Sequence, residues 1–327
     1  MIHGASVGMV IIGRNEGERL IQGLKGIPNN VDRVVYVDSG STDGSGKAAR
    51  EEGAEVVTLD MSQPFTAARA RNAGVDRLRK DGLPDFIQFM DGDCALREGW
   101  IDHAVAFLIE RPEAAVACGR RRERFPEASV YNRMCDDEWN TPVGRTKACG
   151  GDALMRAEAF DRAGGFNATL IAGEEPELCV RLRATGWEVW RLDHEMTWHD
   201  AAMTRLSQWW TRTRRGGYAF AVGASIHGAP PERHWVAETR RALIWGAILP
   251  AGIFLAGLLV SPWALVGFFV YPLQVIRLAL KNGHPPDWPH GFFMVVGKFA
   301  EAFGVAQGWF DMMTGRRKAL IEYKAKG

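Results

Sequence analysis

The sequence predicts an α/β protein with a doubly wound, mostly parallel sheet, followed by a helical hairpin in a membrane. Two observations predict this. Short apolar strands alternate with helical segments through the first half of the chain, and an almost wholly apolar stretch occupies residues 242–280. Alternation of this kind builds βαβ units. The apolar stretch is about twice the ~20 residues that one membrane-spanning helix needs.

The first strand is expected at 7–12, after which Gly13-Arg14-Asn15-Glu16 turns into a helix that ends near Leu24. Right-handed crossovers bring the carboxyl ends of parallel strands to one edge of a sheet. Asp38 and the loop after the central strand should therefore face one crevice. The elements that follow the first helix are strand 34–37, helix 46–52, strand 55–58, helix 66–80, strand 86–90 and helix 100–110.

The central strand, Phe86-Ile87-Gln88-Phe89-Met90, is followed directly by Asp91-Gly92-Asp93. Open α/β sheets bind ligands at the carboxyl ends of such strands. Two carboxylates separated by a glycine suit Mg²⁺ or Mn²⁺, which keep open positions for phosphate oxygens. The alternative is a solvated Asp-Gly turn. The buried strand before the motif favours a site that handles a diphosphate.

Composition narrows the class of protein. The 327 residues carry a net charge of +1, which favours neither nucleic acid nor a strongly acidic partner. The five cysteines show no C-x-x-C spacing, so they predict no zinc site and no disulfide framework. Reduced thiols fit a cytosolic compartment. Residues 7–12 are too short for the apolar core of a signal peptide, so no cleaved leader is expected.

The apolar stretch 242–280 predicts two spanning helices that turn at Ser261-Pro262. Arg277, near its end, is the one charge inside it. Arg240-Arg241 on one flank, and Arg277 with Lys281 on the other, place both ends on the cytoplasmic face. The alternative, a buried hairpin in a soluble protein, is disfavoured by the length and the near-absence of charge.

A third apolar segment, roughly 291–314, contains Lys298, Glu301 and Asp311. Lys298 and Glu301 are three residues apart and can share a helix face. An interfacial amphipathic helix is expected here. A third spanning helix is the alternative, and it would place the basic residues 316–318 outside, against the charge rule.

A set of short motifs resembles family 2 of the inverting glycosyltransferases, of the bacterial polysaccharide and glycolipid type. Their order and spacing, from about Val7 to about Tyr218, carry the resemblance. It implies the GT-A nucleotide-diphospho-sugar transferase fold. The motifs are VIIGRNE (10–16), VVYVDSGSTDGS (34–45), ARARN (68–72), FMDGD (89–93), GGDALMRAEAFDRAGGF (150–166, beginning with Gly150 and Gly151), GEEPELCVRLR (173–183) and WHD (198–200).

The resemblance implies that Asp38 accepts from the base of a nucleotide and that Glu16 lies near the nucleoside. Arg71, with Asn72, corresponds to the pair in the base pocket, although an ordinary helix-surface arginine is the alternative. For Asp38 the alternative is a cap in the Ser/Gly-rich loop, a role we expect for Asp43.

The metal expected from the resemblance is Mn²⁺ or Mg²⁺. Asp93 is the expected direct ligand. Asp91 is expected to bind the ribose or a metal-bound water. His199 is a candidate further ligand, and a structural histidine is the equally weighted alternative.

The general base of the family corresponds to Glu175 or Glu174. Glu175 stands where the family usually has Asp, and we favour it. A charged first turn of the helix that runs to Arg183 is compatible with this role. Gly151 and Asp152 correspond to the loop that contacts the donor sugar.

Arg212 and Arg215 lie three apart on an expected helix. They could bind the pyrophosphate of the donor, or anionic lipid. Gln208 and Trp209-Trp210 do not form the Q-x-x-R-W motif of processive synthases, which argues against processivity.

The expected protein is a metal-dependent hexosyltransferase of polysaccharide biosynthesis. Its expected donor is a UDP-sugar, and its expected acceptor is a lipid-linked saccharide or a glycolipid. The alternatives are a non-catalytic nucleotide-binding membrane subunit and a nucleotidyltransferase. The expected place is the bacterial inner membrane, with the catalytic domain on the cytoplasmic face. The expected domains are 1–220 (GT-A domain), 221–240 (linker), 241–281 (hairpin) and 282–327 (interfacial helix and basic tail).

Overall fold

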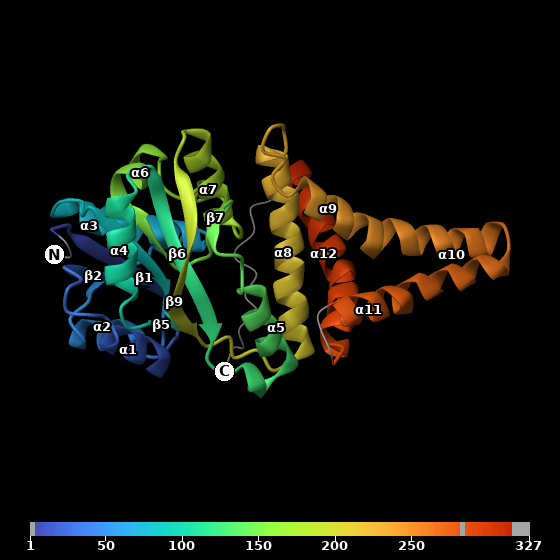
Figure 1. Cartoon of the computed structure of the whole chain (residues 1–327), viewed down its shortest axis with the longest axis horizontal. Coiled ribbons are helices and arrows are strands. Elements are labelled where there is room, and N and C mark those ends of the chain that lie inside the picture. Colours follow the sequence, from blue (N-terminus) through green and yellow to red (C-terminus); the bar gives the residue numbers. More distant parts are fainter. Residues whose placement is uncertain (1–3, 282–284, 316–327) are drawn as a thin grey trace. The chain divides into compact units, whose positions relative to one another are not determined.

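The computed structural model describes residues 4–281 and 285–315 and divides the chain into two compact units, Met1–Ala202 and Met203–Gly327 (Figure 1). The sequence-based boundary at 220 is therefore too late. It falls inside a continuous helix, α8 (Leu206–His227), which belongs wholly to the second unit. We describe each unit by itself.

The first unit is a mixed sheet with helices packed on it. Among the described residues, the strand order is β3-β2-β1-β4-β8-β6-β9-β5, and β7 pairs with β9 beside this path. The strands are β1 (Val7–Gly13), β2 (Arg33–Asp38), β3 (Glu55–Thr58), β4 (Phe86–Asp91), β5 (Cys94–Leu96), β6 (Ala114–Glu123), β7 (Gly144–Thr146), β8 (Ala153–Arg156) and β9 (Glu188–His199). The helices are α1 (Glu18–Lys25), α2 (Ser45–Glu51), α3 (Ala67–Lys80), α4 (Trp100–Glu110), the 3₁₀ turn Pro126–Ala128, α5 (Val130–Glu138), α6 (Ala157–Arg162) and α7 (Glu174–Ala184).

The strands β3, β2, β1 and β4 are parallel, as the alternating pattern predicted. Beyond β4 the sheet is mixed, because β8 runs antiparallel to both β4 and β6, whereas β6 and β9 are parallel. The chain moves from β1 outward to β3 and then returns to β4 on the other side of β1, so the direction of winding reverses between β1 and β4. Such a reversal is where open α/β sheets bind ligands.

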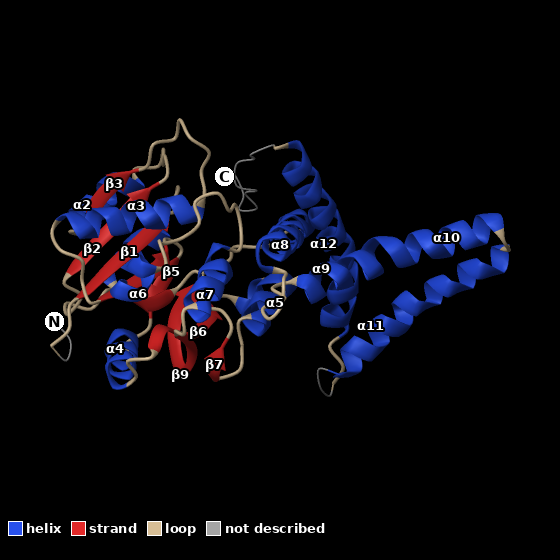
Figure 2. Cartoon of the chain, turned by 90° about the horizontal axis from the view of Figure 1, so that it is seen from above, coloured by secondary structure: helices blue, strands red, loops and turns tan. Residues whose placement is uncertain are grey.

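Strand register places the predicted polar ends together. Gly13 pairs with Asp38, and Ile12 pairs with Asp91, so both carboxylates lie at the same edge of the sheet. The helix α3 packs on β1 and β2, seen from above in Figure 2. Its Gly74 permits the close approach, because a Cβ there would collide with the Val10 side chain. The packing of α3 on the sheet therefore fixes the position of β4 and of the acidic loop that follows it.

The second unit is helical. Besides α8, it contains α9 (Val236–Leu243), a π-helical segment (Ile244–Ile248), α10 (Leu249–Leu259), a 3₁₀ segment (Pro262–Phe269), α11 (Val270–Lys281) and α12 (Trp288–Thr314). Much of the expected linker 221–240 is therefore helical, because α8 continues to His227 and α9 begins at Val236. The wide π turn precedes Pro250, which has no N–H to donate to the previous turn.

Two helices of the described chain are long and apolar enough to cross a membrane, Val236–Leu259 and Pro262–Lys281. They correspond to the expected hairpin and are joined at Val260 and Ser261, the far tip of the paired helices in Figure 1. Only 6% of the most apolar window of each is buried inside the protein. Their apolar side chains therefore face outward, unlike those of a core hairpin.

The third apolar segment forms α12, which packs closely along α8. A Cβ at Gly304 would collide with the carbonyl oxygen of Arg214, so a small residue is needed there. Lys298 and Glu301 share a face as expected, with Nζ 2.6 Å from Oε2. The interfacial position of α12 stays a prediction. The basic residues 316–318 lie outside the described residues.

Candidate active site

The site begins at the acidic loop after β4. Asp91 is partly exposed, whereas Asp93 is buried. The loop is held to the neighbouring strand because the Gly92 N–H donates to the Ile12 carbonyl oxygen at 2.8 Å. Gly92 also lies against Glu16, since a Cβ at this glycine would come 3.0 Å from the Glu16 Cγ. The structure therefore brings Glu16 next to the loop, and its place near the nucleoside stays a prediction.

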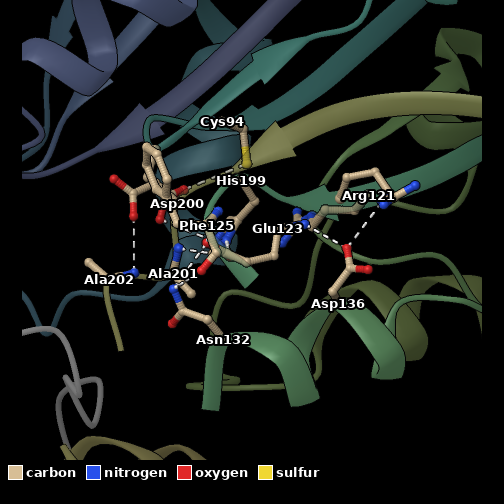
Figure 3. Close-up of polar contacts among 12 residues, drawn as sticks. Cys94, Arg121, Glu123, Phe125, Asn132, Asp136, His199, Asp200, Ala201 and Ala202 are labelled. Atoms are coloured by element: carbon tan, nitrogen blue, oxygen red, sulfur yellow. Dashed lines mark hydrogen bonds and ion pairs between the residues drawn. The ribbon is translucent and has the colours of Figure 1, made fainter. Parts of the chain in front are cut away.

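Asp93 meets His199, which ends β9. The Asp93 Oδ2 lies 3.3 Å from His199 Nε2, and both side chains are at least 95% buried. The other ring nitrogen, Nδ1, lies 3.4 Å from Glu123 Oε2 (Figure 3). The imidazole is thus placed between two buried carboxylates.

This arrangement fits a divalent cation. A neutral imidazole carries one N–H, so it donates to one carboxylate and turns a lone pair toward the other. A cation held by Asp93 and His199 removes that repulsion, and carboxylate oxygen with imidazole nitrogen is a donor set that Mn²⁺ accepts. Cys94 lies within the same group, but burial raises the pKa of its thiol well above the ordinary value. As a neutral thiol it donates to Asp93.

Arg71, on α3, is the centre of a second cluster. Its Nη1 lies 2.9 Å from Glu174 Oε1 and 2.8 Å from Glu175 Oε1, and its Nη2 lies 2.8 Å from Asp91 Oδ1. The side chain is 3% exposed, which excludes an ordinary helix-surface arginine. Burial by itself lowers the pKa of the guanidinium, but the surrounding carboxylates outweigh it and raise that pKa. Arg71 therefore stays charged and joins α3, the acidic loop and α7.

Glu174 and Glu175 occupy the first turn of α7, as predicted. The Glu175 side chain is 14% exposed, whereas the Glu174 side chain is 4% exposed. Burial, and after it the charge of Glu174, raise the pKa of the Glu175 carboxyl to about 7, against the opposing effect of Arg71. A carboxylate with this pKa can accept a proton near neutral pH.

Gly151 lies against the cluster around Arg71. A Cβ on it would come 2.7 Å from Arg71 Nη2 and 2.9 Å from Asp91 Oδ2. Glycine is therefore required for the backbone to pass here. Its position beside these charges agrees with a loop that contacts the donor.

Asp152 does not match the expected contact with a sugar hydroxyl. It is fully buried, and its oxygens accept from the Asp91 N–H at 3.1 Å and the Thr197 hydroxyl at 2.7 Å. Arg121 Nη2 lies 2.8 Å from the same carboxylate. These protein contacts leave Asp152 no surface for a ligand. Its carboxylate instead holds the acidic loop in place, through the hydrogen bond from the Asp91 N–H.

Asp38 ends β2, and its Oδ1 accepts from the Ser41 N–H at 3.2 Å. The carboxylate stays partly exposed at the sheet edge. Asp43 accepts from the Ser45 N–H at 3.0 Å and from its hydroxyl at 2.6 Å, so its role is structural as expected, but it holds the turn before α2, whose N-cap residue is Gly44. The role of Asp38 toward a base stays a prediction.

Arg212 and Arg215 lie on α8, in the second unit. Their binding to pyrophosphate or lipid stays a prediction.

Two residues of the site on β6 were not predicted from the sequence, the partly buried Arg121 and the buried Glu123. The run Arg120-Arg121-Arg122-Glu123 at the end of an apolar segment was the available signal. Alternation along the strand turns Arg121 and Glu123 to the same face, which the arginine cluster by itself does not reveal.

Comparisons with known proteins agree with this geometry. Residues 9–161 match the family described as Glycosyl transferase family 2. The succinoglycan biosynthesis protein ExoA of Rhizobium meliloti is 26% identical over 173 residues, which are 49% of this chain and 52% of that protein. The glycosyltransferase AglE of Haloferax volcanii is 24% identical over 198 residues, 56% of this chain and 63% of that protein. The chain spans about half the length of the first curated relatives it matches.

Among solved structures, the mannosyltransferase PcManGT from Pyrobaculum calidifontis, in complex with GDP-Man and Mn²⁺, matches with a TM-score of 0.65. The two are 17% identical, over 94% of this chain and 88% of that one, so the likeness concerns the fold. Taken with the sheet topology and the acidic loop after β4, these matches show that the chain has the GT-A fold and that residues 9–161 are similar to glycosyl transferase family 2.

Proposed function

We propose that the chain is an inverting glycosyltransferase that moves a sugar from a nucleotide-diphospho-sugar, with UDP as the nucleotide, to an acceptor held at a membrane. The observation that carries this proposal is Glu175. It combines a pKa of about 7 with a place beside Asp91 and Gly151, at the ligand-binding edge of the sheet. A non-catalytic scaffold protein has no need of a carboxylate whose pKa is raised to near neutral pH.

In the proposed reaction Glu175 accepts the proton of the acceptor hydroxyl. The hydroxyl oxygen attacks the anomeric carbon, and the nucleoside diphosphate departs from the opposite face, so the configuration inverts. Glu174 raises the pKa of Glu175, and Arg71 holds both carboxylates at the site. The greater exposure of Glu175 supports its choice over Glu174.

Asp93 and His199 would hold Mn²⁺ or Mg²⁺, with Asp91 at the edge of the same loop. The bound cation supplies charge neutralisation for the departing diphosphate. The mannosyltransferase neighbour, whose structure holds Mn²⁺ and GDP-Man, supports the use of a cation and of a nucleotide sugar. A GDP-sugar is therefore included in the test of the donor. Asp38 and Glu16 are proposed to lie at the nucleoside, and Arg212 and Arg215 at the pyrophosphate.

The proposed acceptor is a lipid-linked saccharide or a glycolipid. Its support is the pair of outward-facing apolar helices, Val236–Leu259 and Pro262–Lys281. We propose that they form a hairpin in the bacterial inner membrane, with both ends and the family 2 domain on the cytoplasmic face. The basic flanks support this orientation. We propose that α12 lies along the same interface.

The test is donor turnover by the full chain in detergent. A panel of UDP- and GDP-sugars is offered with Mn²⁺ or Mg²⁺, with and without membrane lipid extract, beside Asp93→Asn and Glu175→Gln. Metal-dependent nucleotide release that rises with lipid and is lost in both variants is expected. Equal transfer to a soluble sugar would contradict the lipid acceptor. Tight nucleotide binding without any turnover would favour a non-catalytic membrane subunit.

A further inference from the structure

Glu123 is a buried residue next to the proposed metal site, on the side of His199 opposite to Asp93. It is the last residue of β6, pairs in register with His199 on β9, and its side chain has no exposed surface. In Figure 3 the Glu123 and His199 side chains point toward one another, with Asn132 on the other side of the carboxylate. None of the roles assigned above uses this residue.

Among the described residues, each polar contact of the Glu123 carboxylate is with a group that can donate a hydrogen bond. Its Oε1 accepts from the Phe125 N–H and from Asn132 Nδ2, both at 3.2 Å, and its Oε2 accepts from the Ala201 N–H at 3.0 Å. Three donors from three segments fix both oxygens. A position surrounded by donors suits an ionised carboxylate, which can only accept hydrogen bonds. These bonds hold Oε2 beside the His199 ring.

The imidazole is fixed by its surroundings. Glu123 lies at Nδ1, Asp93 lies at Nε2, and the Trp139 ring packs edge-on against the imidazole with centroids 4.7 Å apart. A hydrogen bond from Nδ1–H to Glu123 sets the tautomer in which Nε2 carries the lone pair. That lone pair then points to the side of Asp93, where a cation would bind.

We propose that Glu123 is a positioning residue for the metal site, which holds His199 in the tautomer and orientation needed to bind the cation and thereby sets the metal affinity. Histidine ligands in proteins generally donate their second nitrogen to such a partner, and loss of the partner weakens metal binding about 10- to 100-fold. The inference rests on the proposed function in one respect, namely that Asp93 and His199 bind a divalent cation.

The experiment measures binding of Mn²⁺ alone to the full chain in detergent, by electron paramagnetic resonance of the free ion. Glu123→Gln is expected to raise the dissociation constant about 10- to 100-fold. The matched control is Glu188→Gln, which removes a charge at the start of β9, the strand that ends in His199, where Glu188 pairs with Arg145 on the surface. The control is expected to bind Mn²⁺ as the unaltered protein does.

A second variant is included because the side-chain NH₂ of Glu123→Gln would face the N–H donors that surround the carboxylate, and this disfavours folding. Glu123→Asp keeps the charge but withdraws it from His199, and it too should weaken Mn²⁺ binding. In both variants the Mn²⁺ concentration for half-maximal transfer should rise, whereas the rate at saturating Mn²⁺ stays near that of the unaltered protein. Thermal melting of each variant confirms that it is folded.

The outcomes separate the two proposals. If His199→Ala weakens Mn²⁺ binding while folded Glu123→Gln and Glu123→Asp do not, the role of Glu123 is overturned and the metal site stands. If Asp93→Asn and His199→Ala both leave Mn²⁺ binding unchanged, the metal site itself is overturned. Equal weakening by Glu123→Gln and Glu188→Gln would indicate a general loss of structure, and would also overturn the positioning role.

Discussion

Arg71 faces three carboxylates with one guanidinium, and this imbalance explains much of the chemistry at the scale of single residues. A single positive charge cannot fully compensate Asp91, Glu174 and Glu175 in a buried setting. Burial and the neighbouring charge of Glu174 disfavour the ionised form of Glu175 more than Arg71 favours it. The raised pKa of Glu175 is the result.

This raised pKa predicts the dependence of activity on pH. Because Glu175 must be ionised to accept a proton, the rate at saturating substrate should rise with pH through about 7 and level off above it. Glu175→Gln should lower kcat by about 10²- to 10⁴-fold and remove this rise. In Glu174→Gln the rise should persist but move to lower pH, since Glu174 raises the pKa of Glu175. A rise near pH 7 that survives in Glu175→Gln would contradict the assignment of the base.

Loss of Arg71 should cost stability as well as activity. Arg71→Met leaves the carboxylates without their buried cation, which typically costs about 3–5 kcal/mol. The matched control is Arg79→Met on the same helix, whose guanidinium is 45% exposed and pairs with Asp161. Its cost should stay within about 1 kcal/mol. Urea unfolding at pH 8 measures both. The Arg71→Met penalty should shrink as pH falls, because the carboxylates then become protonated.

At the scale of elements, sequence patterns predicted the structure where burial is continuous. The strands β1 and β4 are apolar on both faces, so a run of apolar residues was sufficient to place them and the acidic loop. The strands β5 and β7 have three residues each, too few for a pattern. The antiparallel half of the sheet, and with it the position of Glu123, depends on contacts between distant segments that no local pattern encodes.

The loop before β8 offers a prediction about backbone approach. A Cβ at Gly151 would come within 3.0 Å of Arg71 and Asp91, so Gly151→Ala must displace the charged cluster. Displacements near 1 Å cost catalysis about 10²-fold, and we expect a loss of roughly tenfold or more in kcat/KM for the donor. Gly150→Ala is the control, because a Cβ there meets nothing within 4 Å. Equal effects of the two changes would contradict a role for close approach at Gly151.

At the scale of the whole molecule, composition separated the two parts of the chain correctly but misplaced their boundary. The apolar stretch is visible in any hydropathy profile, and the structure contains the two outward-facing helices there. The position of the boundary depends on α8, whose mixed polar and apolar sequence carries no sign of the unit to which it belongs. The helix α8 belongs to the second unit because it packs along α12, with close contacts at Gly217 and Gly304.

The membrane topology gives the last prediction. At about 1.5 Å per residue, the 24 residues of Val236–Leu259 span ~36 Å, and the 20 residues of Pro262–Lys281 span ~30 Å, enough for the apolar core of a bilayer. The tip residue Val260, which is 83% exposed, should then lie on the far side of the membrane. The exposed residues Val143 and Ala229 should lie on the cytoplasmic side. The five native cysteines are buried, so single introduced cysteines report position with little background.

In spheroplasts, a membrane-impermeant maleimide should label Val260→Cys directly. It should label Val143→Cys and Ala229→Cys only after the membrane is opened, because no reagent reaches the cytoplasmic side before that. Labelling of all three only after opening would mean that the helices do not cross, and the hairpin proposal would fail. Direct labelling of Val143→Cys would place the first unit on the side where no nucleotide-sugar pool is expected, and would contradict the cytoplasmic orientation.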